Sequence, residues 1–227
     1  MTERAGTASA FAGFPEQALE FYDGLQADNT KAYWTDHRAI YEQAVKAPLE
    51  ALLAALESEF GHAKLFRPYR DVRFSKDKTP YKTAAAAAAG DDGPGVLYLQ
   101  LSADGLLLAG GAYSLATDQA RRLRAAIADD RTGRALVRVL APVRAAGFEI
   151  DGERLKRLPK EFEPDAPRAD LLTLKTLVAV QHHEPAPWLH GSQALDRIGA
   201  AWRALGPLNA WLASHVGPPR VVRQPGR

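Results

Sequence analysis

Cysteine is absent from this 227-residue chain. Without thiols the protein forms neither disulfides nor cysteine-ligated zinc or iron–sulfur sites, and thiolate catalysis is excluded. Long apolar runs are absent as well: no stretch of about 18 apolar residues occurs, so we expect no membrane-spanning helix. The first residues, MTERAGTASAFAGF, lack the basic start and apolar core of a signal peptide. These absences predict a cytoplasmic protein with no membrane partner.

Motifs for phosphate loops, dinucleotide binding and zinc hydrolysis are missing too. The chain has no Gly-x-x-x-x-Gly-Lys, no Gly-x-Gly-x-x-Gly and no His-Glu-x-x-His. His182-His183-Glu184 is the nearest approach to a metal-binding cluster, but neighbouring side chains on a strand point to opposite faces. We therefore predict no metal and no cofactor.

Net charge is small, +2 for the whole chain, but it is unevenly distributed. Such a small total gives no general attraction to nucleic acids or anionic membranes. The segment from Lys64 to Lys82, however, holds seven basic and two acidic residues, a local charge of +5. This concentration of positive charge marks the first candidate for a binding site.

Hydrophobic periodicity predicts helices toward both ends of the chain and strands between them. Helical spacing and capping residues predict helices at 14–25, 30–45 (capped by Asp28 or Asn29), 48–60, 118–130 (capped by Thr117), 134–146 and 193–215, the last interrupted at Pro207. Alternation and turn residues predict strands at 63–67, 70–74 and 178–180, and a hairpin at 96–113 around Asp104-Gly105. The six alanines of 84–89 favour a helix by composition, but their place before a sheet favours a strand or linker.

Together these elements predict an α+β fold, in which a mostly antiparallel sheet packs with N-terminal and C-terminal helices. The chain length suits one domain with a full core. We expect a disordered leader at 1–10, a single α+β domain at 11–216 and a flexible tail at 217–227. The oligomeric state stays open.

The segment FRPYRDVRFSKDKTPYK, residues 66–82, interleaves its cations with aromatic residues. Arginine matches a carboxylate or phosphate with a two-pronged fork of donors, and lysine adds a point charge. A merely solvated loop needs no such aromatic residues, which favours a site built for an anion. The candidate anion ligands are Arg67, Arg70, Arg73, Ser75, Lys76, Lys78 and Lys82.

Aromatic walls and one carboxylate complete the predicted site. Trp34, Tyr69 and Tyr81 are the candidate pocket walls, and Asp71, held beside Arg73, is the candidate catalytic base. The function predicted first is binding of a small ligand that bears phosphate or carboxylate. The sequence leaves open whether the protein is also an enzyme.

Two other functions fit the same segment. Its cations could contact the phosphates of a nucleic acid, a binding mode that weakens steeply with salt, although the other 208 residues carry a net charge of −3. Alternatively, Asp71 and Asp77 neutralise part of the charge in an internal salt-bridge network, and the protein is structural or binds a protein partner. Ser75 and Lys78 also match a Ser-x-x-Lys nucleophile pattern, but Pro80 contradicts the helix which that mechanism needs.

The central segment, extended to FRPYRDVRFSKDKTPYKT, also carries a resemblance. With GFPEQALEFYDGLQADNTKAYWTDHRAIYE, YLQLSADGLLLAGGAY, LKRLPKEFEPDAPRADLL and the closing WLH and AWRALGPLNAWL, it resembles a bacterial family known as a domain of unknown function, family twenty-four sixty-one. The resemblance covers about residues 11–216 and implies no activity that can be carried over. In the family pattern a histidine usually follows Tyr-Lys-Thr, whereas Ala84 stands there in this chain. An activity that needs this histidine would be lost here, leaving only binding.

Overall fold

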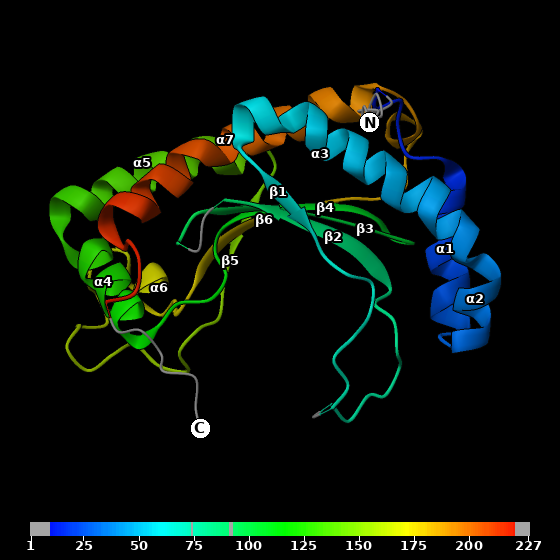
Figure 1. Cartoon of the computed structure of the whole chain (residues 1–227). Helices are drawn as coiled ribbons and strands as arrows, with labels where there is room; N and C mark the ends of the chain where they lie inside the picture. Colours follow the sequence, from blue (N-terminus) through cyan, green and yellow to red (C-terminus); the bar gives the residue numbers. More distant parts are fainter. Residues whose placement is uncertain (1–9, 74, 91–92, 221–227) are drawn as a thin grey trace, which may run out of the picture. The chain divides into compact units, whose positions relative to one another are not determined.

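A computed structural model describes residues 10–73, 75–90 and 93–220 as helices, strands and connecting loops (Figure 1). The helices are α1 (Glu16–Ala27), α2 (Lys31–Ile40), the π-helix η1 (Tyr41–Lys46), α3 (Ala47–Phe60), α4 (Thr117–Ala128), α5 (Asp130–Ala145), α6 (Ala169–Leu172), the 3₁₀-helix η2 (Pro187–His190) and α7 (Gln193–His215). The strands are β1 (Ala63–Leu65), β2 (Ala84–Ala89), β3 (Val96–Ser102), β4 (Gly105–Ala112), β5 (Glu149–Asp151) and β6 (Leu177–His183).

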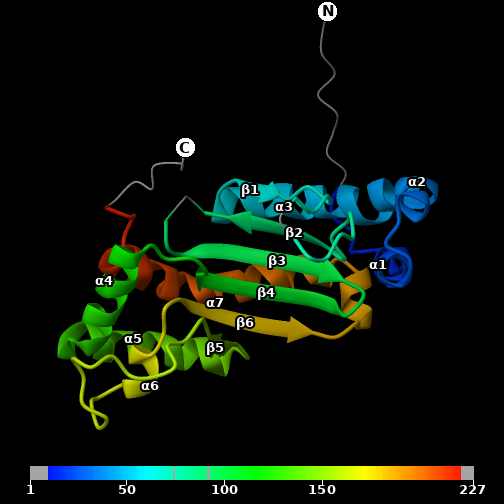
Figure 2. The ribbon, with the colours of Figure 1, turned by 90° about the horizontal axis from the view of Figure 1, so that it is seen from below.

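The strands form one antiparallel sheet in the order β1-β2-β3-β4-β6-β5, as the view in Figure 2 shows. The predicted α+β class, with a mostly antiparallel sheet and helices from both ends of the chain, is confirmed. No helix within the described part of the chain is long and apolar enough to cross a membrane.

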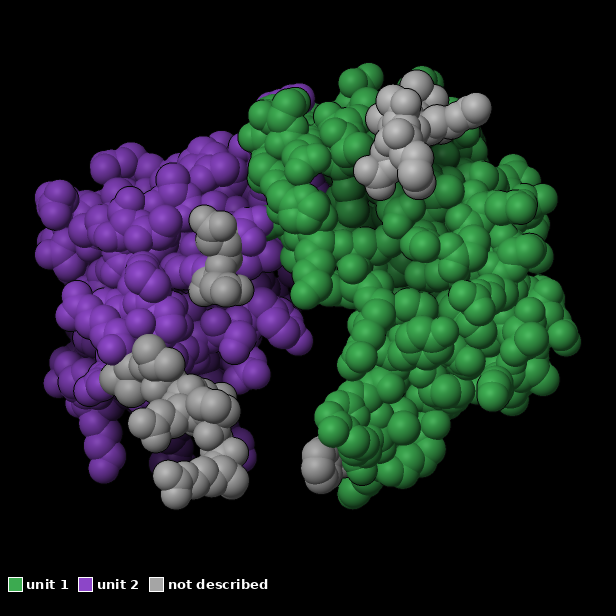
Figure 3. Space-filling model, viewed as in Figure 1, with its two compact units in different colours: residues 1–89, 98–107, 182–200 green, residues 90–97, 108–181, 201–227 purple. Residues whose placement is uncertain are grey.

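The chain divides into two compact units that interleave along the sequence (Figure 3). Unit 1 comprises residues 1–89, 98–107 and 182–200, and unit 2 comprises residues 90–97, 108–181 and 201–227. The single domain expected over 11–216 stays a prediction. The expected leader and tail lie outside the described residues, except for residues 10 and 217–220.

In unit 1, helices α2, η1 and α3 follow one another without a break, although the sequence predicted an end near Val45 and a new start at Pro48. A proline ring collides with the carbonyl four residues earlier in a regular helix. Here Pro48 follows a π-turn, in which Ala47 N donates to Glu42 O, and this wider turn gives the ring room. Four of the five apolar residues that we expect to share one face of α3, which include Phe60, are buried: Leu49, Leu52, Leu53 and Leu56.

The helix cap was assigned to the wrong residue. Thr30 is the N-cap of α2, and its side chain accepts a hydrogen bond from Tyr33 N at 3.2 Å. Asn29, one of the two predicted caps, bonds instead to Tyr81, 52 positions along the chain. Local spacing identified the start of the helix but not which of three capping-type residues was free to cap it.

The six alanines form strand β2, which pairs antiparallel with β1 so that Ala63 lies opposite Ala89. Alanine is the best helix former, but a run of six alanines that ends at Gly90 is too short for a stable isolated helix. Sheet pairing on both sides therefore decides the structure. The predicted hairpin of β3 and β4 is confirmed, and Gly105 after its turn has a φ of 102°.

The predicted strand at 70–74 is wrong. Residues 66–73 and 75–83 form no regular strand, and the one ladder element among them is an isolated antiparallel bridge between Tyr69 and Tyr81; Phe74 lies outside the described residues. Two aspartates account for the difference because each bonds to a backbone N–H two residues on. Asp71 Oδ1 accepts from Arg73 N at 3.2 Å, and Asp77 Oδ1 accepts from Thr79 N at 2.9 Å.

In unit 2, three helix boundaries differ from the predicted ones. Thr117 is the first residue of α4 rather than its cap, and α5 begins at Asp130 because the side chain of Asp129 accepts from Thr132 N at 2.9 Å. Helix α7 continues through Pro207 without the predicted interruption. Its apolar residues on either side of the proline, Leu205 and Leu208, are fully buried, and this burial favours the continuous helix.

Candidate functional site

Backbone pairing joins the two ends of the basic segment 66–82, residues 66–69 and 80–82, which we call its base. Besides the bridge between Tyr69 and Tyr81, Arg70 N donates to Pro80 O at 2.9 Å and Lys82 N donates to Pro68 O at 2.8 Å. Asn29 then clamps this base to the helices, since its amide donates to Tyr81 O at 3.0 Å and accepts from Tyr81 N at 3.1 Å. The two ends of the loop are therefore held together beside the start of α2.

The three predicted wall residues meet in one aromatic cluster. The rings of Trp34 and Tyr81 are stacked, with centroids 4.4 Å apart and an interplanar angle of 8°. Tyr69 lies 6.0 Å from Trp34 and 5.5 Å from Tyr81. Tyr41, from the π-helix, adds a fourth ring 4.8 Å from Trp34. Of these four, Tyr69 is the exposed one, with 48% of its surface accessible.

A cavity of about 320 Å³ opens in unit 1 beside this cluster. Three of the predicted site residues line it: Trp34, Arg67 and Tyr69. The other lining residues are Arg38, Tyr41, Glu42, Lys46, Glu50, Leu65, Phe66 and Pro68. Four charged lining residues were not predicted from the sequence: Arg38, Glu42, Lys46 and Glu50. They follow one another at intervals of four positions, which places them on one face of a helix.

The π-helix shapes the chemistry of the cavity. Three of its six residues, Tyr41, Glu42 and Lys46, line the cavity wall, and such turns occur often at functional sites. Lys46 Nζ donates to Glu42 Oε2 at 2.9 Å, and this bond raises the pKa of Lys46. Burial, followed by the charges of Glu42 and Glu50, raises the pKa of Tyr41 to about 12, so its hydroxyl remains a proton donor near neutral pH.

Between the two ends lie residues 70–79, which we call the tip of the loop. Both aspartates of the tip are paired with arginines. Arg73 grips Asp71 with two prongs, Nε to Oδ1 at 2.9 Å and Nη2 to Oδ2 at 2.7 Å. Arg70 Nη1 donates to Asp77 Oδ2 at 2.5 Å. The hydrogen bonds from Arg73 lower the pKa of Asp71, which keeps its carboxylate ionised but makes it a weaker base. Asp71 does not line the cavity, and its catalytic role stays a prediction.

The remaining predicted anion ligands divide between tip and base. Lys76 and Lys78 are exposed at the tip, where Lys78 Nζ donates to Val72 O at 2.9 Å, as does Ser75 N at 3.4 Å. At the base, Lys82 Nζ lies 5.6 Å from the centre of the Phe66 ring, a cavity residue. Burial, and then the charge of Arg67, lowers the pKa of Lys82. Arg67, which lines the cavity, and Lys82, which is not among the lining residues, therefore repel one another.

Two of the histidines, His37 and His183, pack against aromatic rings. Within the described ranges no group of three or more histidine, aspartate or glutamate side chains is placed to hold a metal ion. His183 packs edge-on against Trp188 at 5.2 Å, and His37 stacks on Tyr33 at 3.9 Å. Ala84, which stands where the resemblance leads us to expect a histidine, is the first residue of β2. What that replacement does to activity stays a prediction.

Comparison with known proteins identifies one relationship. No curated protein and no solved structure matches the chain. The profile of a family described as "Conserved hypothetical protein (DUF2461)" matches residues 17–211, which include every residue of the cavity and of the basic segment. Because the match covers most of the sequence and agrees with the resemblance of its central segment, the chain belongs to this DUF2461 family.

Proposed function

We propose that the protein binds a small ligand with a carboxylate or phosphate group in the unit 1 cavity. Arg67 and Lys82 contact the anionic group. Tyr41 and Tyr69 contact the rest of the ligand, with Trp34 behind them. The proposal concerns binding, and no reaction is assigned.

The pairing of the arginines carries this proposal. The two aspartates of the segment are bonded to Arg70 and Arg73, and neither of these arginines lines the cavity. Arg67 does line it and, in the described part of the chain, forms no ion pair with a carboxylate. A guanidinium on a cavity wall, without a carboxylate partner, offers a fork of donors that fits an oxyanion.

Lys82 supports the same assignment. Its pKa is lowered by burial and by Arg67, so the protein holds two cations together at a cost in free energy. A bound anion removes that repulsion and restores the pKa of Lys82. The hydroxyl of Tyr41, which stays protonated, adds a donor within the same cavity.

The size and charge of the cavity favour a small ligand over a nucleic acid. Its lining includes Glu42 and Glu50 beside its three cations, and both carboxylates repel a polyanion that extends along the wall.

Isothermal titration calorimetry with inorganic phosphate, nucleotides, sugar phosphates and dicarboxylates tests the proposal. We expect at least one ligand to bind wild type and Arg73→Gln equally, and to bind Arg67→Gln at least about tenfold more weakly. Arg73 is the matched control because it lies in the same segment but is paired and outside the cavity. Absence of binding by the whole panel, or equal losses in the two variants, contradicts the proposal.

A duplex oligonucleotide separates the nucleic-acid alternative. If the segment binds nucleic acid, log K falls by about 0.9 per contacted phosphate as log salt rises, and Lys76→Gln weakens binding as much as Arg67→Gln. We expect no binding at low salt. A gel-shift assay that shows this salt dependence would replace the small-ligand proposal.

A further inference from the structure

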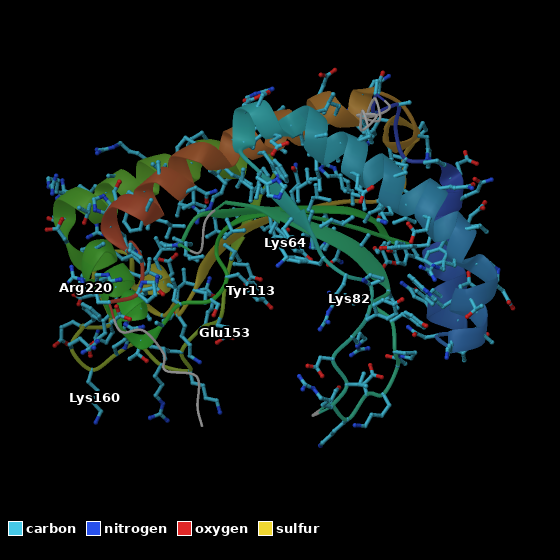
Figure 4. All side chains as sticks on the ribbon, in the orientation of Figure 1. Lys64, Lys82, Tyr113, Glu153, Lys160 and Arg220 are labelled. Carbon is cyan, nitrogen blue, oxygen red and sulfur yellow. The ribbon has the colours of Figure 1, made fainter. Side chains whose placement is uncertain are left out.

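Unit 2 has a cavity of its own, of about 300 Å³, which shares no residue with the cavity in unit 1. Its walls come from four separate stretches of chain: the residues after β4, helix α4, the residues after β5, and those before β6. Figure 4 labels Tyr113 and Glu153, which follow β4 and β5 and lie near one another.

One of the two cations of this cavity, Arg124 on α4, has no carboxylate partner in the described part of the chain. Arg122 on the same helix shows what a structural arginine does here, since it binds Asp118 at 2.7 Å and the carbonyls of Val216 and Pro218 at 2.5 and 2.6 Å. Arg124 makes no such contacts and faces the cavity instead.

Lys175 and Glu153 are held in place by their backbones rather than by their charges. Lys175 N donates to Glu153 O at 2.7 Å, and Glu153 N donates to Thr176 Oγ1 at 2.8 Å. Their side chains approach to 3.6 Å, which is too long for a hydrogen bond, and 72% of the Glu153 side chain is exposed. An exposed pair of this kind contributes little to stability, so both charged groups remain available to a ligand.

An exposed aromatic ring completes the lining. Tyr113 is 85% accessible, the most exposed of the large hydrophobic residues that the structure describes. Large exposed aromatic side chains that rim a cavity are characteristic of binding sites, where the ring supplies contact area and the hydroxyl remains solvated. The hydroxyls of Ser114 and Thr117 lie in the same lining.

We propose that this cavity is a second ligand site, for a small polyhydroxylated molecule that carries one oxyanion, such as a sugar phosphate or a sugar acid. Arg124 and Lys175 bind the oxyanion, and the carboxylate of Glu153 accepts hydrogen bonds from ligand hydroxyls. The ring of Tyr113 packs against the carbon skeleton. A simple inorganic anion uses only the two cations and therefore binds more weakly.

Calorimetric titration of the full chain tests this site separately from the one in unit 1. Arg67→Gln serves as the background, because it disables the proposed unit 1 site. In this background we expect glucose 6-phosphate or gluconate to bind, and the result for each shows whether a phosphate or a carboxylate is preferred. Adding Arg124→Gln should weaken binding at least about tenfold. Adding Arg121→Gln, an exposed position of α4 outside the cavity, should leave binding unchanged.

Three further results decide the class of ligand. Tyr113→Ala should weaken the binding of glucose 6-phosphate but not that of inorganic phosphate. Glucose should bind far more weakly than glucose 6-phosphate. Circular dichroism checks that each variant is folded. The proposal is overturned if neither ligand binds in the Arg67→Gln background, if Arg121→Gln weakens binding as much as Arg124→Gln does, or if inorganic phosphate binds as tightly as glucose 6-phosphate.

Discussion

The base and the tip of the basic segment both carry arginine and lysine, but they are held by different forces. The base, residues 66–69 and 80–82, is joined to the helices by stacked rings and by the clamp of Asn29. The tip, residues 70–79, is held by ion pairs among its own exposed side chains. Buried rings contribute several kilocalories per mole, whereas exposed ion pairs contribute little. The base therefore packs against the core of unit 1 through Tyr81, and the described residues of the tip lie at the surface.

The same comparison separates the cations by role. At the tip, Arg70 and Arg73 neutralise Asp77 and Asp71, the aspartates whose side chains also accept from the backbone of the loop. At the base, Arg67 and Lys82 have no such partner among the described residues and repel one another. The positive charge that the sequence concentrates in this segment therefore belongs to two structural regions. Of these, the base, whose cations have no carboxylate partner among the described residues, is the one suited to bind an anion.

Trp34→Ala should have the largest effect, because it removes the ring on which the base is stacked. Trp34 is 5% exposed and contacts Phe21, Tyr41, Tyr69 and Tyr81. We expect the free energy of unfolding, measured by urea denaturation, to fall by about 3–5 kcal/mol. Trp34→Phe, which keeps a ring, should lose less than half of this. A loss below about 1 kcal/mol for Trp34→Ala would mean that the base is not anchored to the core.

Asn29→Ala should have the next largest effect. It removes both hydrogen bonds of the clamp and leaves the backbone groups of Tyr81 without these partners, which predicts a loss of about 1–3 kcal/mol. Asp28→Ala is the matched control, because Asp28 is the exposed neighbour and makes no such clamp. Equal losses for the two variants in urea denaturation would contradict the assignment of Asn29 to the base.

The clamp also shows where sequence reasoning succeeds and where it stops. Periodicity and capping chemistry predicted the helices, the β3–β4 hairpin and the buried face of α3, because those features depend on neighbours within a few residues. The partner of Asn29 lies 52 positions away, and local preferences cannot distinguish it from a cap. The alanines of β2 stayed undecided between helix and strand for the same reason, since they owe their conformation to the neighbouring strands.

The candidate site was predictable in part. Charge density and interleaved rings drew attention to a segment from which Arg67 and Tyr69, together with Trp34 of α2, line a cavity; that this cavity binds an anion stays a prediction. Pairing within the tip was not predictable, because the choice between a strand and aspartate-bonded turns depends on which backbone groups find partners. The charged residues from Arg38 to Glu50 follow one another at a regular spacing in the sequence. That they line one cavity with the basic segment depends on tertiary packing, which the spacing does not reveal.

A smaller effect should follow from the pH dependence of Lys82. Its pKa in the folded protein lies below its ordinary value of 10.5, so the folded state loses this proton before the unfolded state does. The free energy of unfolding should therefore rise with pH between the folded pKa of Lys82 and 10.5. A lysine that is stabilised by a carboxylate partner has the opposite effect, because its contribution to stability is lost as pH rises. Melting temperatures across this range should show the rise in wild type and not in Lys82→Met. A rise of equal size in both proteins would exclude Lys82 as its source.

The smallest effect is expected at the tip. Hydrogen bonds from Arg73 and from Thr79 lower the pKa of Asp71 and of Asp77, so their stabilising contribution is complete above 3.8 and is lost as pH falls through their folded values. In NMR spectra the backbone amides of Arg73 and Thr79 should shift below this pH while the signals of the base stay unchanged. Asp71→Asn and Asp77→Asn should each change the melting temperature by about 2 °C or less. A much larger fall would mean that the ion pairs hold unit 1 together, and the segment would then be a structural network rather than the support of an anion site.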